Sequence, residues 1–368
     1  MYGGGVSMKE DKFNELLKIN DDFNKDINKK INKAMRKQIN SRVIAIIVTI
    51  AIIIAGIYCG VSFALGKPNI LDNISYNPFN ENDFVVIEEE GNRLDGYHVL
   101  MGTFIGMNYP GKFYYGSSFE DNYIKNGLGS YDIKAKIQDI MDPLHVDGIS
   151  NITFQIRNSS MDYETSVNHM LSRTMHEFYD ERYKEQFDDF WLYYSLNDIK
   201  ELPDSAILDV SLSFDKTKSL EDTVEFINEY KGSIFHWIAT DVNNYSIANG
   251  ISLYDAAIYG FTDKANKEYP GFYLNNDLTA DSIKESYLSK LKLLIDHEDF
   301  IRLLDSCFKN PKSLQVSLKE RYEAAKSKGV EAIGIRGIVK KADLLQMIEK
   351  NQLKFAFVNN AKLSKLQK

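Results

Sequence analysis

Hydrophobic residues are unevenly distributed along the chain, and one uninterrupted run dominates the pattern. Residues 43–65 contain no charged side chain. A helix rises about 1.5 Å per residue, so about 20 apolar residues cross the roughly 30 Å of hydrocarbon in a bilayer. The run is long enough to do so with a modest tilt. It therefore predicts a single transmembrane helix.

Upstream of this run, apolar residues recur at helical spacing. At 100° per residue they share one stripe, and charged residues cover the opposite side. The stripe consists of Phe13, Leu16, Leu17, Phe23, Ile27 and Ile31. Because an isolated helix is marginal in water, this N-terminal amphipathic helix needs a cover. Three covers remain open: the groove of a partner protein, the inner leaflet of a membrane, and a second copy of the helix.

The first part of the chain beyond the apolar run has a weaker pattern. Residues 66–82 are rich in Asn, Pro and Ser, which predicts a linker. Strand-like runs follow at 84–87, 97–107 and 152–157, and the pattern becomes more helical over 166–182. These segments leave the fold of residues 83–190 open.

The pattern is clearer from about residue 191. Alternation over 206–214 predicts a half-buried strand, and Ser219 with Asp222 predicts a capped helix start. Apolar residues on both faces of 234–239 are typical of a central strand. These segments form one strand–helix–strand unit.

A second strand–helix–strand unit closes the chain. It has strands at 332–339 and 353–357 around a helix near 344–348, and helices are expected between the units at 282–296 and 314–327. Two such units on one sheet predict an α+β exterior domain, for which a ferredoxin-like arrangement is the candidate.

Charge divides the chain where hydropathy does. The whole chain carries 44 Lys and Arg against 52 Asp and Glu, a net charge of −8, which argues against direct nucleic-acid binding. Residues 1–42, however, hold 10 basic and 6 acidic residues, and the basic ones crowd toward the apolar run. The positive-inside rule then places the N-terminus in the cytoplasm and the C-terminus outside the cell, on a single-pass protein of the cell membrane.

These patterns divide the chain into five parts. They are a cytoplasmic basic arm (1–42), a transmembrane helix (43–65), a linker (66–82), an N-terminal exterior part (83–190) and a C-terminal α+β domain (191–368). Within the predicted span, Gly56 and Gly60 form a GxxxG pair, a spacing that lets two helices pack closely. The pair predicts transmembrane packing in a homodimer, with chance occurrence of two small residues as the alternative.

Signatures of catalysis, of cofactor binding and of metal binding are missing. The six histidines show no metal-ligand spacing, and no GxSxG, P-loop or GxGxxG occurs. Ser289 and Lys292 fit SxxK without the accompanying motifs of that enzyme class, and His236 is expected to be a hydrogen-bonded core residue on its strand. We therefore expect no catalytic, cofactor-binding or metal-binding residues, and no enzyme activity.

Several strings resemble one bacterial family. They are LDVSLSFDK at 208–216, FHWIATD at 235–241, YGF at 259–261 and GIRG at 334–337. They are similar to the C-terminal domain of sigma factor regulators, which are membrane anti-sigma factors of low-GC Gram-positive bacteria. Residues 33–56, basic and then apolar, resemble the accompanying N-terminal domain of that family.

The resemblance implies an anti-sigma role. The cytoplasmic helix would restrain an extracytoplasmic-function sigma factor at the membrane, and the exterior part would sense the state of the envelope. The arm would bind the sigma factor as a single helix in a groove, or act with a second membrane protein. The alternative from the residues alone is a membrane-anchored exterior binding or assembly protein with no role in transcription.

Overall fold

The computed structural model gives two compact units, Met1–Ile70 and Leu71–Lys368. The residues that it describes are 25, 28–30, 32–33, 48–58, 76–85, 95–115, 123–127, 129–139, 149–157, 160–162, 178, 197–241, 250–253, 261–274, 278–306 and 313–363. Each unit is considered by itself.

The first unit contributes short helical stretches. Residues 25, 28–30 and 32–33 are helical and exposed, and residues 48–58 form a helix within the predicted span. The large apolar side chains of this second helix, seven from Val48 to Tyr58, are each 50–67% exposed. Across the described residues, no helix combines the length and apolarity needed to span a bilayer.

Within Leu71–Lys368, the two predicted strand–helix–strand units share one antiparallel sheet. The first comprises β6 (Ala206–Ser219), α5 (Leu220–Glu229) and β7 (Ile234–Asp241), and the second β9 (Glu331–Lys340), α10 (Lys341–Glu349) and β10 (Leu353–Leu363). The order of this C-terminal sheet is β10-β6-β9-β7-β8, with β8 (Gly250–Ser252) at one edge. Strands of the two units alternate, as in the split arrangement of ferredoxin-like folds.

Strand β6 differs from its prediction in burial. The alternation of apolar and polar residues indicates a half-buried strand, but residues 208–214 are buried on both faces. The polar positions Asp209, Ser211 and Ser213 point into the protein rather than into solvent. A polar side chain tolerates such a position when it finds a partner, and Asp209 has one in Arg336.

Between β8 and β9, the described residues form four helices. They are α6 (Asp263–Glu268), α7 (Ala280–Asp296), α8 (Glu298–Asp305) and α9 (Leu314–Lys328). The predictions of helices at 282–296 and 314–327 are confirmed by α7 and α9, which pack against each other. The short helices α6 and α8 have no counterpart in the sequence prediction.

A second antiparallel sheet precedes these elements. This N-terminal sheet contains β1 (Lys112–Tyr115), β2 (Tyr123–Gly127), β3 (Ser130–Asp139), β4 (Ile149–Arg157) and β5 (Ser160–Asp162), in the order β1-β3-β4-β5 with β2 beside β3. The prediction of a strand at 152–157 is confirmed by β4. The helical pattern at 166–182 lies outside the described residues except for Phe178.

The predicted strand at 97–107 is wrong, because these residues form helix α2 (Gly96–Asn108). Eleven of its thirteen residues are buried, on every side of the helix. A helix that is enclosed on all sides has no polar face and shows no period of 3.6 in its hydropathy. The local sign of a helix is Asp95, whose carboxylate caps the first turn by accepting a hydrogen bond from the His98 N–H.

The predicted strand at 84–87 is also wrong at its first residue, and residues 86 and 87 lie outside the described part of the chain. Residue 84 ends a 3₁₀ helix, η2 (Pro78–Phe84), and Val85 forms an isolated bridge with Phe261. Asn77 at the N-cap and Pro78 at the first position are ordinary helix-start signals. Part of the predicted linker 66–82 is therefore folded, and Tyr76 within it is buried.

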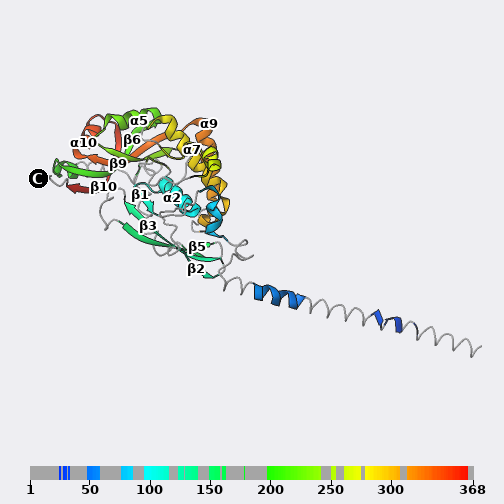
Figure 1. The fold of residues 1–368 in the computed structure, drawn as a ribbon. Helices are drawn as coiled ribbons and strands as arrows, with labels where there is room; N and C mark the ends of the chain where they lie inside the picture. The colour runs from blue at the N-terminus through cyan, green and yellow to red at the C-terminus, as the bar shows by residue number, and fades with distance from the viewer. Residues whose placement is uncertain are drawn as a thin grey trace, which may run out of the picture. The chain divides into compact units, whose positions relative to one another are not determined.

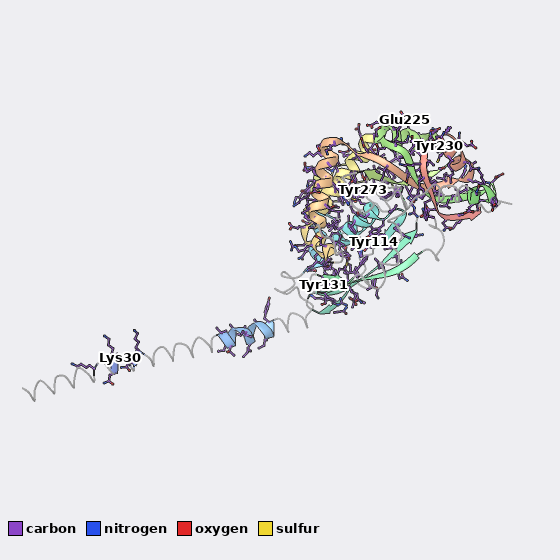
Figure 2. The ribbon with its side chains drawn as sticks, turned by 180° about the vertical axis from the view of Figure 1, so that it is seen from behind. Lys30, Tyr114, Tyr131, Glu225, Tyr230 and Tyr273 are labelled. Atoms are coloured by element: carbon purple, nitrogen blue, oxygen red, sulfur yellow. The ribbon has the colours of Figure 1, made fainter. Side chains whose placement is uncertain are left out.

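Helix α2 lies between the two sheets (Figure 1). It contacts β1 of the N-terminal sheet, β8 of the C-terminal sheet, η2 and α7. Helices α5 and α10 cover the opposite face of the C-terminal sheet. In Figure 2, Tyr131 on β3 and Tyr230 after α5 lie toward opposite ends of this unit, with Tyr114 between them. One continuous core joins the predicted parts 83–190 and 191–368.

Candidate functional site

The sequence-predicted partner-binding residues lie outside the described part of the chain. This holds for Phe13, Leu16, Leu17, Phe23, Ile27 and Ile31, and for Gly60. Gly56 lies on the exposed helix 48–58, and a Cβ added there would meet no atom within 4 Å. The partner-binding stripe and the glycine pair therefore stay predictions. What the structure does bring together are polar residues at the two ends of α2.

The C-terminal end of α2 depends on the C-terminal sheet for its hydrogen bonds. The Gly106 carbonyl would normally accept from the N–H four residues on, but that residue is Pro110, which has no N–H. The Trp237 indole on β7 donates to this carbonyl at 2.9 Å instead. The C-terminal sheet thus supplies the hydrogen bond that Pro110 cannot give to the Gly106 carbonyl.

A buried ion pair fixes the turn that follows α2. Arg336 on β9 donates to both carboxylate oxygens of Asp209 on β6, at 3.0 and 2.8 Å, and to the Pro110 carbonyl at 2.8 Å. Both charged side chains are buried. Gly111 has a φ of +74°, and a Cβ there would lie 2.5 Å from the Arg336 Cζ. The guanidinium therefore ties two central strands to the turn.

His236 lies beside this pair and differs from its prediction. It is 1% exposed on β7, where the pairing with β9 shifts register between Phe235 and Trp237. The expectation of a hydrogen-bonded core residue is wrong, because neither ring nitrogen has a partner among the described residues. Its neighbour Trp237 makes the polar contact with α2. Burial, followed by the positive charge of Arg336, lowers the pKa of His236 from 6.5 to about 3.

Replacing His236 with Leu should remove part of the acid sensitivity of folding. As pH falls below about 6.5, the unfolded chain binds a proton at His236 that the folded chain does not bind until about pH 3. The folded state therefore loses about 1.4 kcal/mol per pH unit across that window, and loses nothing from this group above it. Between pH 6.5 and 5, wild type should lose about 2 kcal/mol more than His236→Leu in urea unfolding. Equal losses would contradict the proposed burial of the neutral ring.

The N-terminal end of α2 is held by the N-terminal sheet. Asp95 accepts hydrogen bonds from the His98 N–H at 3.0 Å and from the Tyr123 hydroxyl. The His98 Nδ1 lies 2.5 Å from the Tyr114 hydroxyl on β1. Burial, and then the charge of Asp95, raise the pKa of Tyr123. Tyr123 therefore stays a hydrogen-bond donor to the capping carboxylate.

Beside the same end of α2, η2 makes a polar contact with the residue between α7 and α8. Glu81 Oε2 lies 2.7 Å from His297 Nδ1, with side chains that are 9% and 13% exposed. His297 is the residue between α7 and α8. Burial, and then the charge of Glu81, raise the pKa of Tyr76. Residues from three parts of the sequence thus meet at this point.

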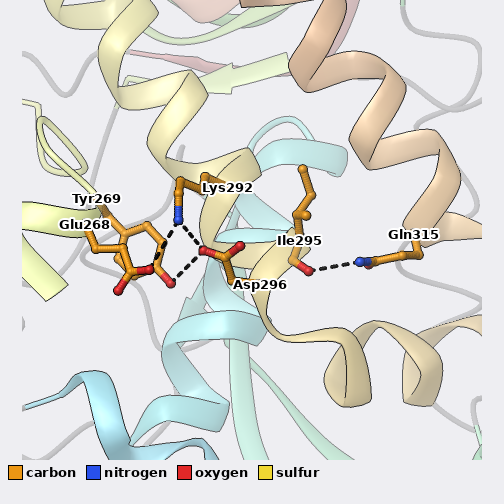
Figure 3. A network of polar contacts seen from close by, with 6 residues as sticks. All are labelled: Glu268, Tyr269, Lys292, Ile295, Asp296 and Gln315. Atoms are coloured by element: carbon orange, nitrogen blue, oxygen red, sulfur yellow. Dashed lines mark hydrogen bonds and ion pairs between the residues drawn. The ribbon is translucent and has the colours of Figure 1, made fainter.

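Ser289 and Lys292, the two residues of the SxxK match, each have polar partners elsewhere in the fold. Ser289 donates to the Pro270 carbonyl, and Lys292 forms ion pairs with Asp296 and, at 3.4 Å, with Glu268. Figure 3 shows Lys292 between these two carboxylates, with the Tyr269 hydroxyl 3.1 Å from Asp296. Ser289 and Lys292 do not act on each other in this arrangement. In the part of the chain with described positions, no three His, Cys, Asp or Glu side chains form a group that could hold a metal ion.

The sequence suggested neither end of α2 as a site. Asp209, Arg336 and Trp237 lie within the strings that carry the family resemblance, and this was the signal available for the C-terminal end. Glu81 and His297 are 216 positions apart, and nothing local connects them. The Arg336 contacts join the turn after α2 to the C-terminal sheet, and the Glu81–His297 contact joins η2 to the α7–α8 junction.

Comparison with known proteins finds a family match in the C-terminal part. Residues 199–360 match the family described as sigma factor regulator C-terminal. The match begins just before β6 and ends within β10, so it includes both strand–helix–strand units, His297 and the Asp209–Arg336 pair. No curated protein and no solved structure is significantly similar to the chain.

Proposed function

We propose that the chain is a single-pass membrane anti-sigma factor. In this proposal the N-terminal helix binds an extracytoplasmic-function sigma factor in the cytoplasm, and the folded C-terminal unit senses the state of the envelope outside the cell. The observation that carries the proposal is the match of residues 199–360 to the C-terminal domain of sigma factor regulators. The low-GC Gram-positive source and the family's N-terminal domain remain predictions from the resemblance.

The membrane anchor is supported by exposure as well as by sequence. Residues 43–65 are free of charge, and the helix at 48–58 presents large apolar side chains that no described residue covers. An exposed apolar surface of this kind needs a cover, and a bilayer supplies one around the whole helix. The basic residues upstream favour an N-terminus in the cytoplasm.

The arm supplies the binding surface for the partner. Its stripe needs an apolar cover, and a groove on a sigma factor, alone or with a second membrane protein, would provide it. Gly56 and Gly60 supply a surface for a homodimer of the span. A double change of both glycines to Ile that leaves the oligomeric state in bilayers unchanged would remove the homodimer from the proposal.

Phe23→Asp and Ile27→Asp should each release the partner. A charge placed in a buried apolar contact costs about 3 kcal/mol or more, which weakens binding at least 100-fold. The measurement is co-purification of a sigma factor with the full chain in detergent. Asn32→Asp is the matched control, because it adds the same charge off the stripe at an exposed helical position. If a sigma factor co-purifies equally with all variants, or with none including wild type, the binding stripe is refuted.

A second candidate follows from the basic residues of the arm. An anchored exterior binding or assembly protein could use the arm only to lie on the inner leaflet. The arm would then bind anionic vesicles with an affinity that falls as salt rises, and its deletion would leave transcription unchanged. We propose no enzymatic activity in either case, since the polar clusters described above hold α2 in place.

A further inference from the structure

We propose that residues 76–85 form a strap, docked on the folded unit by the Glu81–His297 contact, and that its release transmits the state of that unit toward the membrane. The signalling half of this inference rests on the proposed function. The docking half rests on geometry alone.

Buried residues anchor the strap at both ends and in the middle. Tyr76, Glu81 and Val85 are all buried, whereas Phe79 between them is 47% exposed. Asn77 caps the 3₁₀ helix by accepting from the Phe79 N–H at 3.1 Å. Val85 pairs with Phe261, just before α6. The strap is therefore held by these anchors and by packing of η2 on α2, and not by a continuous sheet.

The central anchor is polar and enclosed. The Glu81 carboxylate, buried beside Tyr76, has the His297 ring at 2.7 Å as its partner across the fold. Glu81 and Asp95 both lie close enough to Tyr76 to raise its pKa, so a second carboxylate is near this anchor. A buried carboxylate that loses its partner is strongly destabilised, and the strap is then better placed in water.

The partner of Glu81 belongs to the domain that matches the sigma factor regulators. His297 ends α7 and begins α8, and both helices lie within residues 199–360. Any rearrangement of the α7–α8 junction therefore moves His297 and changes its contact with Glu81. This is the physical link by which the C-terminal domain can act on the segment that precedes it.

The strap is also well placed to change the reach of the tether. Ten residues, 66–75, separate the predicted span from Tyr76, and they extend to at most about 35 Å. Release of residues 76–85 adds ten more residues to this tether and about doubles its reach. Short segments held by few contacts open at a lower cost than the whole fold. The folded unit could then move away from the bilayer without unfolding.

Hydrogen exchange measured on the full chain in nanodiscs tests the docking. Glu81→Ala and His297→Ala should each raise amide exchange in residues 76–85 at least tenfold, while peptides from β6 and β9 keep their wild-type rates. Arg302→Ala is the matched control, because it removes two exposed ion pairs of α8 near His297. Unchanged exchange in 76–85, or an equal rise in β6, overturns the strap.

A transcription reporter driven by the released sigma factor tests the signal. With Phe23→Asp as the positive reference, Glu81→Ala should change reporter output at least threefold, and Arg302→Ala should not. If Phe23→Asp changes the reporter and Glu81→Ala does not, the signalling half is overturned. If Phe23→Asp has no effect, the proposed function fails, and the strap then stands or falls on the exchange result.

Discussion

Asp209→Asn should lower the free energy of unfolding by about 3–5 kcal/mol. The change keeps the shape of the side chain but leaves the Arg336 guanidinium buried without its counter-charge. Removing one member of a buried pair is costly for this reason, although the intact pair itself contributes little net stability. Urea unfolding of the detergent-solubilised chain, followed by tryptophan fluorescence, gives the measurement, since Trp237 packs in the same layer.

The N-terminal sheet offers a matched control for this change. Arg157 and Asp132 form the same kind of pair at 2.6 Å, but with side chains that are 39% and 21% exposed. Asp132→Asn should therefore cost at most about 1 kcal/mol. Equal costs for the two changes would mean that burial does not decide the strength of the Asp209–Arg336 contact.

Gly96→Ala should cost at least about 3 kcal/mol and displace the strap. A Cβ on Gly96 would lie 1.5 Å from the Glu81 carbonyl oxygen and 2.3 Å from its carbon. The clash is with backbone, so no change of rotamer relieves it, and either η2 or α2 must move. Thermal unfolding combined with proteolysis of residues 76–85 measures both effects.

Gly106→Ala is the matched control in the same helix. The nearest atom to its added Cβ is the Ser252 Cβ at 3.6 Å, an ordinary contact distance. Alanine is the better helix former, so this change should be neutral or stabilise the protein by up to about 1 kcal/mol. A similar loss at both positions would show that Gly96 is not needed for the approach of Glu81.

The sequence pattern worked best where elements have distinct faces. Helices α7 and α9 and both strand–helix–strand units were predicted, because each buries one side or carries a capping residue such as Ser219, which accepts from the Asp222 N–H. It failed at α2, whose thirteen residues are enclosed between two sheets and lack a polar face. The sequence pattern also predicted β6 as half-buried, because hydropathy does not distinguish a polar residue that has a partner inside the protein from one that faces water.

The polar clusters could be predicted only in part. The strings around Asp209, Trp237 and Arg336 marked a family domain without showing that these residues hold α2. The Glu81–His297 contact joins a predicted linker to a junction of two helices, and only tertiary structure brings them together. Hydropathy also does not show that the His236 ring nitrogens have no hydrogen-bond partner among the described residues.

Our central proposal is that the apolar stripe of the N-terminal arm lies in the cytoplasm and restrains a sigma factor. Its most direct test is whole-transcriptome sequencing of cells that carry the full chain as wild type, Phe23→Asp or Asn32→Asp. The account predicts that Phe23→Asp induces a defined set of promoters with one shared recognition sequence, as deletion of the gene does, and that Asn32→Asp does not. A transcriptome that is unchanged by both Phe23→Asp and the deletion would contradict it.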